Sequence, residues 1–177
     1  YANATAPGAD PNLQAIVADP RIGDAIGRLS SWDFSTPTGI TEGFDPFDAP
    51  YSTPGAPEIN ASIAATVYSM WRGQMVRRVI DGTLATLPTL SNYAPPSDQA
   101  MSALRRLLDN YAINGGTGAS LVNFFRVPGV ADPFVSRDVI LLQSLQNGLN
   151  RLASSTFAAA FNNSTDLNDY RWGKLHR

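Results

Sequence analysis

The strongest constraint on the fold is a helical pattern of apolar residues between positions 58 and 87. Its members recur every three or four residues on one broad stripe: Ile59, Ile63, Val67, Met70, Trp71, Met75, Val79 and Ile80. Side chains at this spacing share one face of an α-helix, so the pattern predicts a long amphipathic helix that buries this face. Gly73 and Gly82 each weaken such a helix by about 1 kcal/mol relative to alanine. We expect a bend or a close helix contact near either glycine, and we expect Pro88 to end the helix.

Other segments also carry helix signals. Asp-Pro pairs at residues 10–11 and 19–20 precede apolar-periodic stretches, where the aspartate caps a helix and the proline fits its first turn. Ser97 is expected to cap an amphipathic segment, and the glycines at 115–116 supply a left-handed stop. Ser136 is expected to open a final long helix over residues 136–161. Its apolar face is formed by Ile140, Leu141, Leu145, Leu149 and Leu152. No stretch shows strand alternation of comparable quality, so we expect an all-α fold.

Composition favours a single helical domain over residues 1–177. The chain is 44% apolar and 16% charged, which is typical of a globular protein of this length. Residues 33–57 interrupt the helical pattern with five prolines, and their aromatic side chains predict a long loop that packs against the domain. The helix pair before this loop is too short to fold alone, so we place no domain boundary there.

Charge and cysteine content exclude several classes of function. The net charge of -2 provides no general attraction for nucleic acid or for an anionic membrane. The absence of cysteine removes disulfides, thiolate nucleophiles and cysteine-based metal sites. The apolar runs fall far short of the ~20 residues that cross a bilayer. We therefore expect no nucleic-acid partner, no membrane partner and no cofactor.

Candidate catalytic and metal residues are few. His176, the only histidine, would need a serine nucleophile and an orienting aspartate, and the sequence contains no G-x-S-x-G elbow. We expect a structural role for His176. The acidic residues Glu42, Asp45 and Asp48 lack the spacing of a calcium loop and predict a solvated loop. Trp71 is expected to pack in the core together with nearby methionines. No catalytic, cofactor-binding or metal residue is assigned.

Two further patterns resemble functional sites, but the surrounding sequence favours a structural role for each. The glycine-rich run 115–120 has no lysine after its glycines, so it predicts helix termination instead of a phosphate loop. The pairs Arg77–Arg78 and Arg105–Arg106 lie on predicted helices. Exposed arginines paired with neighbouring carboxylates are the ordinary outcome for such positions.

Several segments, in order along the chain, resemble the penicillin acylase family. Leu29 to Asp33 is similar to a family helix that ends in a Trp-Asp pair, and residues 61–84 are similar to the small-residue and apolar helix that follows it. Residues 170–177, with the sequence YRWGKLHR, resemble the W-x-W-G-x-x-H segment of the family. The residues that we expect to carry the motifs or structural roles are Trp32, Asp33, Trp71, Trp172, Gly173 and His176.

This family comprises N-terminal nucleophile amidohydrolases that act on penicillins, cephalosporins, aculeacin and acyl-homoserine lactones. The resemblance implies a parent enzyme that cleaves the amide of an acylated amine with an N-terminal serine, threonine or cysteine, whose own α-amine acts as base. Tyr1 cannot take that role. The chain is therefore expected to be an inactive helical segment, a scaffold or pocket wall excised from a larger αββα enzyme.

The resemblance also implies the surroundings of the chain. Its partners would be the remainder of the acylase chain and, in the parent, a small-molecule acyl amide. The parent would be periplasmic or extracellular. Trp172 and His176 would anchor the helices to the catalytic sheet. Two alternatives stay open: a freestanding helical binding module with an apolar groove, and a degenerate acylase relative that lost its activity.

Overall fold

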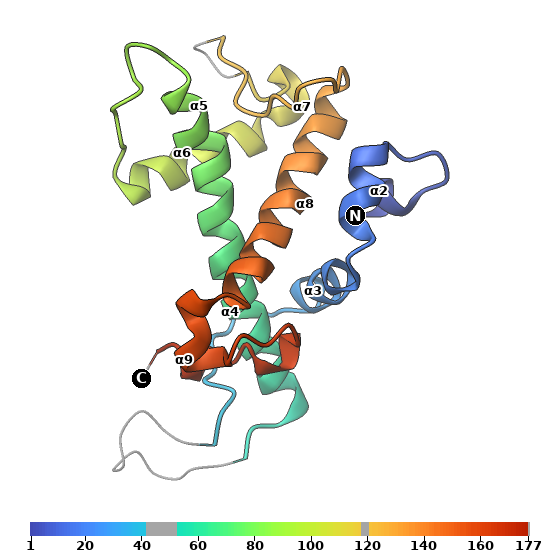
Figure 1. Ribbon diagram of the computed structural model, residues 1–177, viewed down its shortest axis with the longest axis vertical. Helices are drawn as coiled ribbons and strands as arrows, with labels where there is room; N and C mark the ends of the chain where they lie inside the picture. Colours follow the sequence, from blue (N-terminus) through green and yellow to red (C-terminus); the bar gives the residue numbers. More distant parts are fainter. Residues whose placement is uncertain (42–52, 118–120, 177) are drawn as a thin grey trace. The chain divides into compact units, whose positions relative to one another are not determined.

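The computed structural model describes residues 1–41, 53–117 and 121–176. All regular secondary structure in these ranges is helical, which confirms the all-α prediction (Figure 1). Two compact units can be distinguished. Unit 1 comprises residues 1–18 and 72–144, and unit 2 comprises residues 19–71 and 145–177.

Two of the three N-terminal helices begin at the predicted Asp-Pro pairs. In unit 1, the short helix α1 (Ala2–Thr5) precedes α2 (Pro11–Val17), which begins where Asp10 accepts a 2.8 Å hydrogen bond from the Asn12 backbone N–H. In unit 2, α3 (Pro20–Ser30) begins where Asp19 accepts a 3.1 Å bond from the Arg21 backbone N–H. Each carboxylate satisfies an N–H that has no partner within its helix, so both predicted caps are confirmed.

The long helix predicted over 58–87 is three helical segments in direct succession. Helix α4 (Ala56–Val76) leads into a π-helical turn (Arg77–Asp81) and then into α5 (Gly82–Ala85). The Gly82 backbone N–H donates to the carbonyl of Arg77, five residues earlier, so the helix widens by one residue at this point. The interruption therefore lies at Gly82 and not at Gly73, whose Cβ position has no atom within 4 Å.

The second long helix is offset from its predicted range of 136–161. Helix α8 spans Pro133–Leu152, because Asp132 caps it with a 2.8 Å bond from the Phe134 backbone N–H. The prediction of a start at Ser136 is wrong, since a third Asp-Pro pair supplies the cap. After Leu152 the chain turns and forms a 3₁₀ turn (Ser155–Phe157) and the short helix α9 (Ala158–Phe161).

Unit 1 also contains α6 (Ser97–Asp109) and α7 (Tyr111–Asn114). The predicted cap at Ser97 is wrong, because Pro96 occupies the N-cap position, Ser97 is the first helical residue and no side chain caps the helix. Gly115 follows α7 with a φ of 58°, so the predicted left-handed stop is confirmed. A Cβ on the next residue, Gly116, would lie 2.7 Å from ring atoms of both Tyr111 and Phe125. Residues 118–120 of the glycine-rich run lie outside the described residues.

In unit 2 the loop predicted over 33–57 is shorter at its end, because α4 begins at Ala56. Glu58 accepts a 2.8 Å bond from the Gly55 backbone N–H and so helps to fix this start. The described parts of the loop, 33–41 and 53–55, contain no helix or strand. Helices α4 and α8 cross where a Cβ on Gly148 would lie 3.4 Å from backbone atoms of Met70 and Trp71, so a glycine permits their close approach.

Candidate functional site

The acylase-like motif near residue 172 is bonded to two other segments of unit 2. The Trp172 backbone N–H donates a 2.8 Å bond to Ser62 Oγ, and Ser62 Oγ donates a 2.8 Å bond to the carbonyl of Thr38. The Gly173 backbone N–H donates to the same Thr38 carbonyl at 2.8 Å. Ser62 lies on α4 and is 0% exposed. We call this arrangement of Thr38, Ser62, Trp172 and Gly173 the Ser62 junction.

Two glycines allow the segments of the Ser62 junction to approach this closely. A Cβ on Gly173 would lie 2.8 Å from the Cβ of Thr38 and 2.9 Å from the side chain of Ile40. Gly39 has a φ of +69°, and a Cβ there would overlap the side chain of Ser62. Gly173 was expected to have a structural role in the motif. The sequence offers no reason to assign Gly39 a structural role, because the only turn signal nearby is Pro37, two residues earlier.

The residues before Trp172 hold the motif in place. Tyr170 is 0% exposed, and its hydroxyl donates a 2.7 Å bond to the carbonyl of Ser164. Burial raises the pKa of Tyr170. Arg171 donates to the carbonyls of Asn168 at 2.6 Å and Gly39 at 3.2 Å. Burial, and then the nearby positive charge of Arg28, lower the pKa of Arg171.

His176 stacks on the ring of Trp172. Their ring centroids are 4.0 Å apart with an interplanar angle of 29°, and the His176 backbone N–H donates to the Trp172 carbonyl at 3.2 Å. The imidazole is exposed. Within the part of the chain that the structure describes, no side-chain hydrogen bond or ion pair joins His176 to a serine or an aspartate. The arrangement therefore does not assemble a Ser-His-Asp triad around His176.

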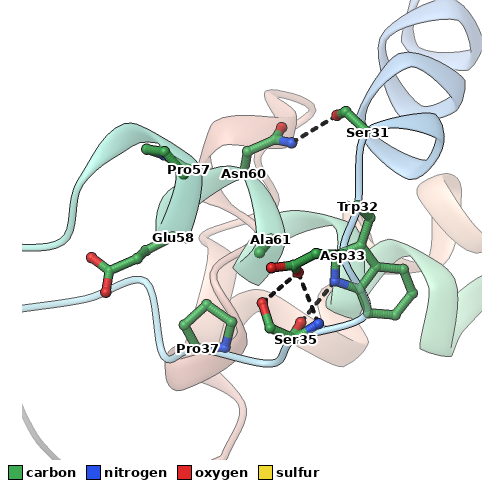
Figure 2. A pocket seen from close by; sticks show the side chains of 9 residues that line it. All are labelled: Ser31, Trp32, Asp33, Ser35, Pro37, Pro57, Glu58, Asn60 and Ala61. Carbon is green, nitrogen blue, oxygen red and sulfur yellow. Dashed lines mark hydrogen bonds between the residues drawn. The ribbon is translucent and has the colours of Figure 1, made fainter.

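Trp32 and Asp33 form a tight turn after α3 (Figure 2). Trp32 Nε1 donates a 2.7 Å bond to the carbonyl of Ser35, while Asp33 Oδ1 accepts bonds from the Ser35 hydroxyl at 2.6 Å and the Ser35 backbone N–H at 2.9 Å. The bond from the Ser35 hydroxyl is the main cause that lowers the pKa of Asp33. Phe34, which lies between Asp33 and Ser35, has a φ of 65° and is 80% exposed.

This turn borders a pocket of about 550 Å³ in unit 2. Figure 2 shows Trp32 and Asp33 on one side of it and Glu58 and Asn60, from the start of α4, on the other. Asn60 donates a 3.1 Å bond to the hydroxyl of Ser31 and so links α4 to the end of α3. The described lining contains no histidine, lysine or arginine, and the carboxylate that accepts from the Ser35 hydroxyl, Asp33, is a weak base because its pKa is lowered.

The motif residues therefore separate into two groups within unit 2. Trp32 and Asp33 shape the rim of the pocket, whereas Trp172, Gly173 and His176 belong to the motif segment at the Ser62 junction. Loop residues 33–41 connect the two groups. Trp71 lies farther along α4 and is half-buried.

A second pocket, in unit 1, contains functional candidates that the sequence did not favour. It has a volume of about 650 Å³, and three arginines line it: Arg77, Arg78 and Arg126. We expected the Arg77–Arg78 pair to bind neighbouring carboxylates. Among the described residues Arg105 does so, 3.5 Å from Asp109, but neither Arg77 nor Arg78 has an ion pair.

Residues 1–41, 53–117 and 121–176 contain neither a metal-ligand cluster nor a helix that could cross a membrane. Those ranges contain no group of three or more histidine, cysteine, aspartate or glutamate residues that could hold a metal ion. The cluster Glu42, Asp45 and Asp48 lies outside the described residues. Across the same ranges, the helices fall short of the length and apolar character needed to span a bilayer.

No protein-family model, curated protein or solved structure matches the chain.

Proposed function

We propose that the chain is the helical portion of the catalytic chain of a penicillin-acylase-like amidohydrolase. The parent enzyme would hydrolyse the amide of an acylated amine of the β-lactam or acyl-homoserine-lactone type. In that enzyme the present helices serve as scaffold and pocket wall beside an αββα catalytic core.

The Ser62 junction is the observation that supports this proposal. The segment Trp172–Gly173 belongs to one of the motifs that carry the resemblance, and the loop that contains Thr38 follows directly after another, the Trp32–Asp33 pair. The backbone of Trp172 and the backbone of Thr38 both bind the buried hydroxyl of Ser62. Ser62 is separated by 110 positions from Trp172 and by 24 positions from Thr38. The Ser62 junction thus gives the motif at Trp172–Gly173 a structural role, which accounts for a motif that contains no nucleophile.

The chemistry of the reaction is assigned to residues outside this chain. Among the described residues, the pocket beside Trp32 is lined by no histidine, lysine or arginine, and no side-chain hydrogen bond joins His176 to a serine or an aspartate. The exposed His176 ring, stacked on Trp172, offers an aromatic surface that the proposed catalytic sheet would cover. The partner of the chain is accordingly the remainder of the acylase.

Two measurements test this proposal. The purified 177-residue chain is assayed with a penicillin and with an acyl-homoserine lactone, and no hydrolysis is expected. The full reading frame is then sequenced and expressed. An internal serine, threonine or cysteine that becomes N-terminal by self-cleavage, together with amide hydrolysis by the processed enzyme, supports the proposal. Hydrolysis by the 177-residue chain itself, or a full protein without such a nucleophile, contradicts it.

A second candidate function is a freestanding helical binding module. The arginine-lined pocket of unit 1 favours it, because ligand sites are concave and combine apolar walls with a few polar groups. A full reading frame that adds no strand-rich sequence to these helices, with ligand binding but no hydrolysis, would favour this function over the acylase.

A further inference from the structure

We propose that the arginine-lined pocket of unit 1 binds a small organic anion, with its carboxylate or phosphate held by Arg77, Arg78 and Arg126 and its apolar body against Phe124, Leu87 and Ile140. This inference does not depend on the acylase proposal. It rests on the shape of the pocket, on its charge and on the π-helical turn beside it.

The pocket has the size and mixed lining of a ligand site. Its volume of about 650 Å³ lies within the range of roughly 300–1,000 Å³ that is usual for small-molecule sites. Arg77 and Arg78 come from the π-helical turn, and Arg126 comes from the segment before α8. Because these arginines come from segments far apart in the sequence, sequence inspection alone does not bring them together.

The π-helical turn changes the helical spacing between Arg77 and Asp81, and no ion pair joins these two described residues. In an uninterrupted α-helix the residue one turn after Arg77 is Asp81, at the i,i+4 spacing that forms ion pairs. The wider turn here bonds the Gly82 N–H to the Arg77 carbonyl and places Gly82 one turn after Arg77. Gly82 and Thr83 line the pocket, whereas Asp81 does not. Single π-turns of this kind occur frequently at functional sites.

Within residues 1–41, 53–117 and 121–176, the arginines of the pocket have no carboxylate partner. No described residue forms a salt bridge or a side-chain hydrogen bond with Arg77, Arg78 or Arg126, and the lining includes no aspartate or glutamate. Elsewhere in the described chain, arginines such as Arg21, Arg28 and Arg137 pair with carboxylates at 2.6 to 2.8 Å. Guanidinium groups bind carboxylate and phosphate with two parallel hydrogen bonds, so an oxyanion is the ligand group that suits this site.

Polar groups beside the arginines supply further contacts. Asn123 accepts a 2.8 Å bond from the Phe125 backbone N–H through its carbonyl oxygen, which leaves its amide N–H groups as donors. Thr83 also lines the pocket and carries a hydroxyl. The apolar lining formed by Leu87, Phe124 and Ile140 would stay uncovered by an inorganic ion. We therefore assign the site to an organic anion.

Binding is tested by calorimetric titration of the 177-residue chain with octanoate and with phenyl phosphate. Octanamide and phenol serve as neutral counterparts of similar shape, and inorganic phosphate tests the anion without an apolar body. At least one organic anion is expected to bind about tenfold or more tightly than its neutral counterpart and than inorganic phosphate. The preference is expected to weaken when sodium chloride is raised from 50 to 500 mM. The stronger of the two anions identifies a carboxylate or a phosphate site.

Variants locate the site. Arg77→Gln combined with Arg126→Gln is expected to weaken the binding by about tenfold or more. Arg106→Gln on α6 is the matched control for charge, since Arg106 is exposed and does not line the pocket. If the double variant loses its helical circular-dichroism signal, Arg126→Gln alone decides, because Arg126 lies outside the helices.

Four outcomes would overturn the proposal. They are equal binding of anions and neutral counterparts, unchanged binding in the folded pocket variants, an equal loss in Arg106→Gln, and binding of a hexaglutamate peptide without binding of either small anion. The last outcome would identify the surface as a docking site for an acidic polypeptide.

Discussion

The hydroxyl of Ser62 accepts a 2.8 Å hydrogen bond from the backbone N–H of Trp172, 110 positions later in the chain. The same hydroxyl donates to the carbonyl of Thr38, so one buried side chain orders both the loop after Trp32–Asp33 and the motif segment. Ser62 lies in the middle of an apolar helix and would be taken for an ordinary small core residue. The bonds of Ser62 hold the motif segment in place, and the side chain of His176 takes no part in them.

Ser62→Ala is expected to lower the free energy of unfolding by about 1–3 kcal/mol, because the part-buried Trp172 N–H and the Thr38 carbonyl would both lose the Ser62 hydroxyl as a hydrogen-bond partner. Urea denaturation followed by tryptophan fluorescence measures the change. Ser102→Ala is the matched control, since Ser102 is an exposed helical serine on α6. We expect the control to stay within about 0.5 kcal/mol of the wild type. Equal stability of the two variants would show that the Ser62 junction contributes nothing.

Gly173→Ala is expected to destabilise unit 2 by about 1–3 kcal/mol, because its new methyl group would lie 2.8 Å from the Cβ of Thr38. Gly27→Ala on α3 is the control. The Cβ position of Gly27 has no atom within 4 Å, and alanine there should stabilise the helix by about 0.5–1 kcal/mol. Thermal unfolding of the two variants should therefore shift in opposite directions. A shift of the Gly173→Ala midpoint to higher temperature would contradict the packing described at this residue.

Ser144→Ala should have the opposite sign to Ser62→Ala, although both serines are buried in long helices. Ser144 is 1% exposed, and its Oγ has no hydrogen-bond partner among the described residues. Removing an unpaired buried hydroxyl relieves a desolvation cost, so we expect a gain of about 1 kcal/mol in the free energy of unfolding. A loss of stability comparable to that of Ser62→Ala would show that the Ser144 hydroxyl has a partner.

Asp19→Asn is expected to reduce stability at pH 7 and to have a smaller effect in acid. The side-chain hydrogen bond from Arg21 is the main cause that lowers the pKa of Asp19. A lowered pKa in the folded state contributes stability above the unfolded pKa, and this stability is lost as the pH falls through the folded pKa. Asparagine keeps the capping oxygen of α3 and removes only the charge. Urea unfolding at pH 7 and pH 2.5 should give a larger difference from wild type at pH 7, and an equal difference at both pH values would contradict this linkage.

The sequence predicted the helices better than their interruptions. Apolar spacing identified the segments that became α4 and α8, and the Asp-Pro pairs located the starts of α2 and α3. The same capping signal at Asp132 was overlooked in favour of Ser136. The π-helical turn was not foreseen, because the apolar face formed by Met75, Val79 and Ile80 fits an α-helix equally well.

The candidate sites depended more on tertiary contacts than on residue patterns. Trp172 and Gly173 were singled out by resemblance, but Ser62 and Gly39 have no local signal, since their roles arise from residues far away in the chain. In the same way, Arg77 and Arg126 come together only through folding. Hydrogen-bond partners of this kind cannot be inferred from the periodicity of one helix.

The π-helical turn has a consequence for how binding by this chain could change. The one extra residue in the π-helical turn determines whether Asp81 lies one helical turn after Arg77. This difference in spacing changes neither the number nor the sign of the charges. A one-residue deletion between Arg78 and Gly82 is therefore expected to abolish the proposed anion binding while leaving all three arginines in the sequence. In this part of the molecule, insertions and deletions should alter ligand affinity more sharply than most substitutions do.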